Sequence, residues 1–422
     1  MNFLFVLPLL VSGVGLYFLI KLKFFFIFHP IRTGRMVLRS MKNKKTRHSL
    51  CLALAGTLGV GNIFGVCAGI MIGGAGSVFW LLVSAIFSMI IKYCECLVAH
   101  ESAESGTGGM HRVILHTFRR LGKPLSMLYA LLCTCLALFM GSAIQSNAVS
   151  DVASCAFKIN PYISAFILAI LLLFAIVGNT ERIEKITAKL IPLTTIFYIL
   201  LTLSVILVNI REIPRVISDI ITSAFSPLAA GGGFVAFFSS NALHEGYARG
   251  ILSNEAGVGT SSLAHTRSTE RTAAESGLAG MLEVFFDTVL LCMLTAFALL
   301  SAMPTVNTET PMSAITNAVT SSLSEFFALP LAVSILIFAY STVICWYYYG
   351  TECVSYLVGE RAKFAFSVAF FAFLLIGAVL HPRFLISTTD IILLFMCILT
   401  LTALIFKRER IFSLSEELCG KK

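Results

Sequence analysis

Charged residues are scarce in this chain, at 13% of its 422 positions. Soluble proteins carry about twice that share. Hydrophobic residues make up 57% of the sequence, more than a soluble domain of this length can bury. This composition excludes a nucleic-acid-binding protein, a cytosolic enzyme and a secreted disulfide scaffold.

Catalytic signatures are also missing. The sequence has no P-loop and no G-x-S-x-G nucleophile elbow. His100-Glu101 and His244-Glu245 begin like an H-E-x-x-H zinc motif, but neither has the second histidine. We therefore predict that the protein is not an enzyme and has no organic cofactor. An intramembrane enzyme and a passive channel are kept as remote alternatives.

Apolar runs of about 18 to 25 residues recur along the chain, the length of a helix that crosses a bilayer. Eleven such spans are predicted, at roughly 3–20, 50–70, 77–98, 125–150, 162–179, 188–209, 228–247, 277–302, 329–350, 364–380 and 385–406. The predicted fold is an all-α, multi-pass transmembrane bundle in the lipid bilayer.

Basic residues predict the orientation of these spans. Only four of the 31 Lys and Arg residues fall on one side of the predicted membrane, namely Lys158, Arg211, Arg215 and Arg383. Loops rich in Lys and Arg stay in the cytoplasm. We expect a protein of the cell (inner) membrane with its N-terminus outside and its C-terminus in the cytoplasm.

Eleven spans divide into one extra helix and two units of five. The units are 50–210 and 211–406, preceded by the extra helix and basic loop at 1–49 and followed by a tail at 407–422. Because five is odd, the second unit is inverted relative to the first. Each unit begins with a glycine-rich span, with Gly56, Gly59, Gly61 and Gly65 in the first and Gly231, Gly232 and Gly233 in the second. Such pairs point to broken helices at a midplane binding site, although small residues also serve close helix packing.

A break in the first of these spans would expose backbone groups of both signs. The N–H groups of Val60, Gly61 and Asn62 would lie at the start of the second half-helix, where the helix dipole favours a carboxylate. The carbonyl groups of the preceding turn, with the side-chain oxygen of Asn62, would suit a bare monovalent cation. These carbonyl groups belong to Ala55, Thr57 and Leu58.

Four segments resemble the alanine or glycine:cation symporter family. They are G-V-G-N-I-F-G-V at 59–66, G-S-A-I-Q-S-N at 141–147, R-G-I-L-S-N-E-A-G-V-G-T at 249–260 and A-Y-S-T-V-I-C-W-Y-Y-Y-G at 339–350. The resemblance implies a LeuT-type fold with a five-plus-five inverted repeat. Val60 departs from the family, which has Thr between the two glycines.

The resemblance also implies roles for residues on other spans. Gln145 and Trp346 would line the substrate pocket, and Ser341 and Thr342 would complete the sodium site, with Thr342 also near the substrate. Asp287 lies deep in a span, so we expect a cation ligand or a proton carrier. The alternatives are purely structural roles: interhelical hydrogen bonds for Gln145 and Asp287, and an anchor at the membrane interface for Trp346. The N-E-A-G segment at 254–257 is expected to form a cytoplasmic turn.

Together these features predict a secondary active transporter that couples Na⁺ to uptake of alanine or glycine by alternating access. Its partners would be a small neutral amino acid, a sodium ion and the bilayer, with no nucleic acid. Proton coupling through Asp287 is the alternative. The sequence does not rank glycine, L-alanine, D-alanine and serine.

Overall fold

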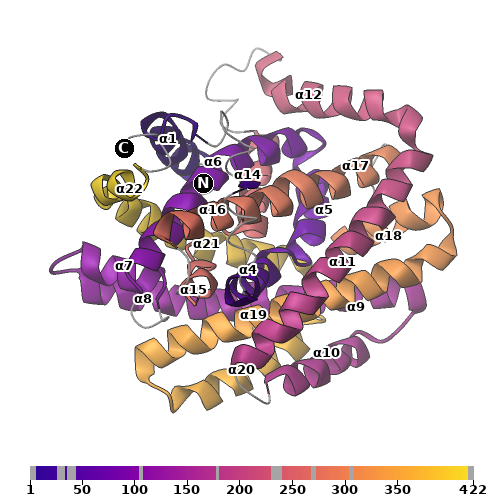
Figure 1. Cartoon of the computed structure of the whole chain (residues 1–422). Coiled ribbons are helices and arrows are strands. Elements are labelled where there is room, and N and C mark those ends of the chain that lie inside the picture. Colours follow the sequence, from indigo (N-terminus) through magenta and orange to yellow (C-terminus); the bar gives the residue numbers. More distant parts are fainter. Residues whose placement is uncertain are drawn as a thin grey trace.

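The chain folds into a helical bundle, as the computed structural model in Figure 1 shows. The structure describes residues 6–25, 34–35, 44–103, 108–176, 180–229, 240–267, 272–303 and 308–416. All regular elements within these ranges are helices. The prediction of an all-α fold is therefore confirmed for the described part of the chain.

The helices of the first half follow the predicted spans. They are α1 (Val6–Lys21), α4 (Lys44–Thr57), α5 (Gly61–Gly73), α6 (Gly76–Glu101), α7 (Met110–Thr117), α8 (Gly122–Leu136), the π-helix η2 (Ala137–Ala143), α9 (Ile144–Phe157), α10 (Pro161–Ile176) and α11 (Thr180–Val208).

The second half begins with a short 3₁₀ turn, η3 (Ile210–Glu212), and an amphipathic helix at the rim of the molecule, α12 (Ile213–Ala229). It continues with α14 (Asn241–Asn254), α15 (Ser262–His265), α16 (Ala273–Val284), the π-helix η4 (Phe285–Cys292), α17 (Met293–Ala302), α18 (Pro311–Ser322), η5 (Glu325–Phe327), α19 (Ala328–Val358), α20 (Ala362–Gly377), α21 (Pro382–Phe406) and α22 (Arg408–Leu414).

Seven helical stretches in the described residues are long and apolar enough to cross a membrane, at 47–73, 76–101, 122–157, 182–208, 273–302, 325–358 and 382–406. The shorter apolar helices α1, α10 and α20 account for three more predicted spans. Residues 230–239 of the seventh predicted span, 228–247, lie outside the described residues, and α14 covers the end of that span and continues to Asn254. The glycines Gly231, Gly232 and Gly233 lie outside the described residues.

The first glycine-rich span is broken, as predicted. Helix α4 ends at Thr57 and α5 begins at Gly61, so residues 58–60 are not helical. Glycine is disfavoured in a helix interior because it loses more conformational entropy than other residues. Two glycines around Val60 therefore make this point the weakest of the span.

Two other membrane helices contain a π-helical segment. In η2 it separates α8 from α9, and in η4 it separates α16 from α17. A π-turn shifts the register of the side chains that follow it and often marks a functional site. Here η2 carries Gly141 and η4 carries Asp287.

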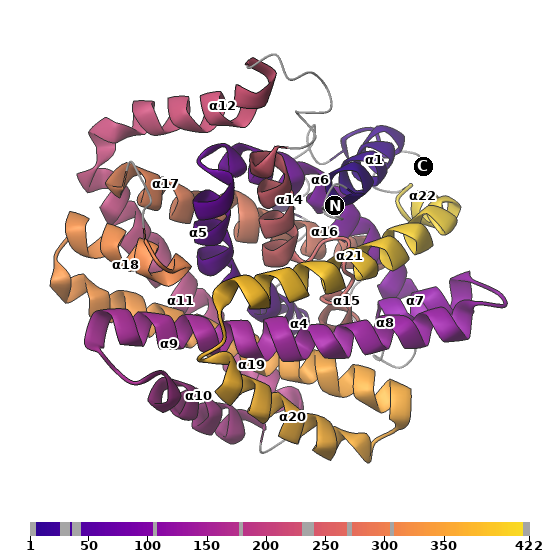
Figure 2. The ribbon, with the colours of Figure 1, turned by 180° about the vertical axis from the view of Figure 1, so that it is seen from behind.

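The helices form two groups around the broken segments. Helix α6 packs along α14 and α16, and α14 packs against α5. On the other side, α8, η2 and α9 form one long rod beside α19, which Figure 2 shows clearly. Helix α19 also contacts α4, so the broken helix lies between the two groups.

Two basic residues that entered the orientation argument are buried inside the bundle. Lys92 lies within α6 and Arg249 within α14, and both are fully buried. The basic asymmetry therefore rests on the other 25 residues of that side.

Candidate functional site

The broken segment keeps two backbone N–H groups unpaired. Gly59 donates its N–H to the carbonyl of Thr57 at 2.8 Å and to Asn62 Oδ1 at 3.1 Å. The N–H of Asn62 donates to Gly59 O, so it is less free than predicted. The N–H groups of Val60 and Gly61 have no hydrogen-bond partner among the described residues. These two donors are available to a carboxylate at the start of α5.

Asn62 joins the break to Asp287. Its Nδ2 donates to Asp287 Oδ1 at 2.5 Å and to the Asp287 carbonyl oxygen at 3.1 Å. Both side chains are buried, with exposed fractions of 1% and 0%. One amide thus caps the unwound turn through its oxygen and holds η4 through its nitrogen.

The other carboxylate oxygen of Asp287 accepts two hydroxyl groups. Ser253 Oγ and Thr288 Oγ1 each lie 2.7 Å from Oδ2. Thr288 Oγ1 in turn accepts Asn254 Nδ2 at 3.0 Å. No described basic side chain forms an ion pair with Asp287, so only neutral donors contact its carboxyl group.

Thr342 faces the break from α19. An atom added at the Cβ position of Gly59 would lie 2.2 Å from Thr342 Oγ1, which shows how closely the two segments approach. Thr342 Oγ1 is buried and has no hydrogen-bond partner in the part of the chain that the structure describes. The neighbouring Ser341 instead donates its hydroxyl to Ile337 O and Phe338 O of its own helix. The structure therefore brings Thr342 to the break, whereas the proton of the Ser341 hydroxyl is used within α19.

Trp346 lies one turn further along α19 and is fully buried. It does not anchor the helix at a membrane interface, because its side chain contacts protein on all sides. A Cβ at Gly141 of η2 would lie 2.2 Å from Trp346 Cβ. Gln145 donates from Nε2 to Met140 O at 3.1 Å, next to Gly141. Trp346 Nε1 and Gln145 Oε1 are buried without partners.

The N-E-A-G segment forms a turn, as expected, but it is buried within the protein. Asn254, Glu255 and Thr260 all have 0% exposure. The chain leaves α14 with positive φ angles at Glu255, Gly257 and Gly259, a conformation that glycine adopts without strain. We call this turn, residues 255–260 between α14 and α15, the second break; the break predicted at Gly231, Gly232 and Gly233 lies outside the described residues.

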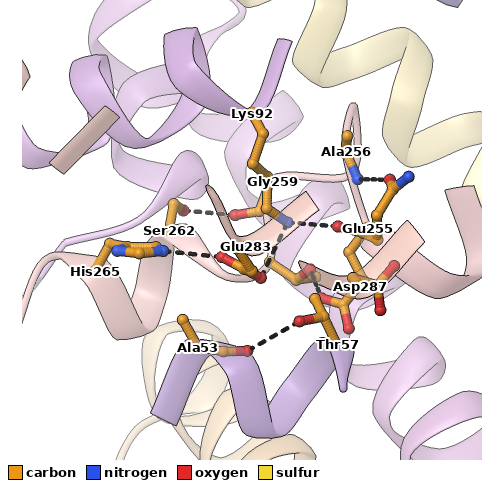
Figure 3. Close-up of polar contacts among 12 residues, drawn as sticks. Ala53, Thr57, Lys92, Glu255, Ala256, Gly259, Ser262, His265, Glu283 and Asp287 are labelled. Atoms are coloured by element: carbon orange, nitrogen blue, oxygen red, sulfur yellow. Dashed lines mark hydrogen bonds and ion pairs between the residues drawn. The ribbon is translucent and has the colours of Figure 1, made fainter. Parts of the chain in front are cut away.

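A charged cluster surrounds this second break, as Figure 3 shows. Lys92 Nζ donates to Asn254 O at 2.8 Å and lies 3.6 Å from Glu283 Oε1. The other Glu283 oxygen lies 2.9 Å from His265 Nε2. Glu255 pairs with the Thr260 hydroxyl. The cluster thus holds the C-terminal end of α14 against α6 and α16.

Two other polar side chains within the membrane helices form contacts between helices. Asn147 Nδ2 donates to Gly377 O and Leu380 O, at 3.0 and 2.8 Å, and so holds the end of α20. Asp390 of α21 forms an ion pair with Arg249 of α14. Both interactions join helices that are far apart in sequence.

The sequence reasoning missed several residues of the site. It treated Asp287 as the one carboxylate well inside a span, whereas Glu95 and Glu283 are buried too. Both lie near the ends of predicted spans, and an ionisable residue within a membrane helix is itself the signal. Ser253 and Asn254 carry no such signal, because small polar residues are common in turns.

Comparison with known proteins places the chain in one family. The model of the sodium:alanine symporter family matches residues 1–418. An uncharacterised transporter of Haemophilus influenzae is 34% identical over 413 residues, which cover 96% of this chain and 91% of that protein. The sodium/alanine symporter AgcS of Methanococcus maripaludis is 31% identical over 379 residues, covering 86% and 82%. A Bacillus subtilis protein named as a probable sodium/glutamine symporter, GlnT, is 28% identical over 427 residues, covering 99% and 88%.

Solved structures agree on the fold. MhsT in complex with L-phenylalanine superposes with a TM-score of 0.62 at 12% identity, over 85% of this chain and 88% of that one. A mutant of the manganese transporter of Eremococcus coleocola gives 0.52 at 14% identity, over 86% and 75%. The fold is therefore the LeuT type, that of membrane transporters and not of enzymes.

Proposed function

The chain belongs to the sodium:alanine symporter family and is a secondary transporter of an integral membrane fold, and we propose that it couples Na⁺ entry to uptake of a small neutral amino acid, alanine or glycine. The observation that carries this proposal is the pairing of an unwound backbone with a buried, unneutralised carboxylate. Val60 and Gly61 present free N–H groups. The next residue, Asn62, donates its side-chain amide to the carboxyl group of Asp287.

The surroundings of Asp287 support sodium as the coupling ion. Three side-chain donors point at its carboxylate and no basic side chain neutralises it in the described part of the chain. Hydrogen bonds donated to a carboxylate stabilise its ionised form, and a monovalent cation would balance the remaining charge. The proposed side-chain ligands are the oxygen atoms of Asn62, Asp287, Ser341 and Thr342. The proposed backbone ligands are the carbonyl groups of Ala55, Thr57 and Leu58.

The unpaired polar atoms support an amino acid as cargo. A carboxylate would accept from Val60 and Gly61, and an ammonium group would donate to Gln145 Oε1 or Thr342 Oγ1, which are buried without partners. Trp346 would limit the size of the side chain. The close contacts at Gly59 and Gly141 leave little room, which favours alanine or glycine over larger substrates.

Transport requires that the site opens to each side in turn. We propose that α4, α5, α6, α14 and α16, which pack on one another, rock against the group of α8, α9 and α19. In this proposal the repeats are 50–210 and 211–406, the N-terminus is outside and the C-terminus is in the cytoplasm of the cell membrane.

Uptake into proteoliposomes tests the proposal. Labelled alanine or glycine should accumulate under an imposed Na⁺ gradient and stop when the gradient is collapsed. A pH step in Na⁺-free buffer should drive no uptake. Full uptake under that condition would instead support proton coupling through Asp287. Competition by D-alanine, serine and glutamine would rank the substrates.

A further inference from the structure

The buried carboxyl group of Glu95 lies outside the proposed sodium and substrate sites. Glu95 lies in the C-terminal half of α6, about one turn beyond Lys92. Its side chain is fully buried. Neither of its carboxylate oxygens has a hydrogen-bond partner that meets normal geometry. It forms no ion pair with any described residue. A buried ionised group in this state would be costly, because the backbone N–H of Gly257 that faces it does not replace all the water that it lost.

The charges around Glu95 do not balance. The interior near the second break holds four carboxyl groups, those of Glu95, Glu255, Glu283 and Asp287. Against them stand Lys92 and, if it is protonated, His265. The proposed sodium ion would compensate one more negative charge, so one excess charge remains. Without that ion the excess is two, so the imbalance does not depend on the proposed function.

The groups that face Glu95 cannot neutralise it. They are Lys92, Cys94 and Cys96 on its own helix, Glu255 and Glu283 on the neighbouring segments, Tyr129 of α8, Cys397 of α21 and the backbone N–H of Gly257. Lys92 is the one cation among them, and its ammonium group is already at Asn254 O and Glu283. The nearest carboxylate, Glu255, is itself buried and bonded to Thr260.

We propose that Glu95 is a proton-binding site that must hold its proton for the second helix break to keep this conformation. The site lies against residues 255–260, where Tyr129 Oη donates to Val258 O at 2.9 Å and a Cβ at Gly257 would touch Cys397 Sγ at 3.2 Å. Loss of the proton places a negative charge beside Glu255 and beside the negative end of the α14 dipole. Both repel it, so the break loosens and transport slows as pH rises.

Infrared spectroscopy of the purified full-length protein at neutral pH tests the proton directly. The parent should show a carbonyl band of a protonated carboxylic acid that Glu95→Gln loses. Glu101→Gln is the matched control, because Glu101 is on the same helix, partly exposed and paired with Arg410. An unchanged band in Glu95→Gln would overturn the proposal. Failure of Glu95→Gln to fold would do so too, since Gln has the shape of the neutral acid.

Exchange of labelled for unlabelled alanine, with equal saturating Na⁺ on both sides, tests the consequence. In the parent and in Glu101→Gln the exchange rate should fall at alkaline pH, by about tenfold per pH unit once one proton is lost. In Glu95→Gln it should stay flat. A parent-like pH profile in Glu95→Gln would refute the role in transport. If no amino acid is exchanged at all, the proposed function fails and the infrared result still decides the proton site.

Discussion

Asn62 and Asp287 are 225 positions apart in the chain, yet the amide of Asn62 donates to both the carboxylate and the backbone carbonyl of Asp287. The contact joins the first broken helix to the π-helical segment η4. The same amide accepts the N–H of Gly59 through its oxygen. A change at either residue therefore alters the unwound turn and the proposed cation site together.

Asp287→Asn should weaken sodium binding most. It removes the one full negative charge of the proposed site while keeping a side chain of similar shape. We expect the apparent Na⁺ affinity in uptake assays to fall by about a hundredfold, which corresponds to about 2.7 kcal/mol. Thr288→Ser retains the hydroxyl that donates to Asp287 and is the control. A Na⁺ dependence that survives in Asp287→Asn would remove Asp287 from the site.

Thr342 offers a matched pair of substitutions. Thr342→Ser keeps the unpartnered hydroxyl at the break, whereas Thr342→Val keeps the shape and removes the oxygen. We expect Thr342→Val to lower the apparent Na⁺ affinity by about tenfold, or about 1.4 kcal/mol, and Thr342→Ser to stay close to the parent. Equal affinities in the two variants would show that this hydroxyl binds no ion.

Trp346 should determine which side chains fit. Trp346→Ala removes a large, fully buried indole. Larger neutral amino acids, such as leucine and phenylalanine, should then compete with labelled alanine, which they do not in the parent. Trp346→Phe retains most of the wall and should keep the narrow range. An unchanged competition profile in Trp346→Ala would place the indole outside the pocket.

Two glycines of the first break should respond differently to an added methyl group. At Gly59 the methyl would lie 2.2 Å from Thr342 Oγ1, whereas at Gly61 its nearest neighbour is Leu252 O at 3.7 Å. Gly59→Ala should therefore lower the thermal unfolding temperature by several degrees, as expected for about 1 to 3 kcal/mol of overpacking. Gly61→Ala should unfold near the parent temperature. The reverse order would mean that α4 and α19 are not in contact at Thr342.

The ion pair of Arg249 with Asp390 should be important for stability. Arg249 is fully buried and also lies 3.1 Å from Glu245 Oε2. Asp390→Asn leaves the guanidinium with weaker compensation, and breaking a buried pair costs about 3 to 5 kcal/mol. The double change Arg249→Gln with Asp390→Asn should lower the free energy of unfolding by less than the sum of the two single changes, because both partner charges are removed together. Additive losses in thermal unfolding would contradict direct coupling.

The sequence determined the all-α fold, ten of the predicted spans and the first break. Hydropathy and the entropic cost of glycine in a helix depend on neighbouring residues only. The eleven apolar runs and the G-V-G-N turn could therefore be predicted from the sequence. The local pattern predicted a turn at residues 255–260 but not its burial, because the segment contains charged and small residues that are typical of a surface turn. Its burial depends on α6, α16 and α21 packing around it.

Which residues far apart in the sequence contact one another was decided by tertiary structure alone. Lys92 reads as a basic residue near a span end, but packing of α6 on α14 carries its ammonium group to Asn254 O. Ser341 and Thr342 are neighbours of similar chemistry, and helical geometry turns one hydroxyl toward its own backbone and brings the other to Gly59. Sequence fixes which residues can interact over one or two helical turns, whereas pairing over hundreds of residues follows from how whole helices pack.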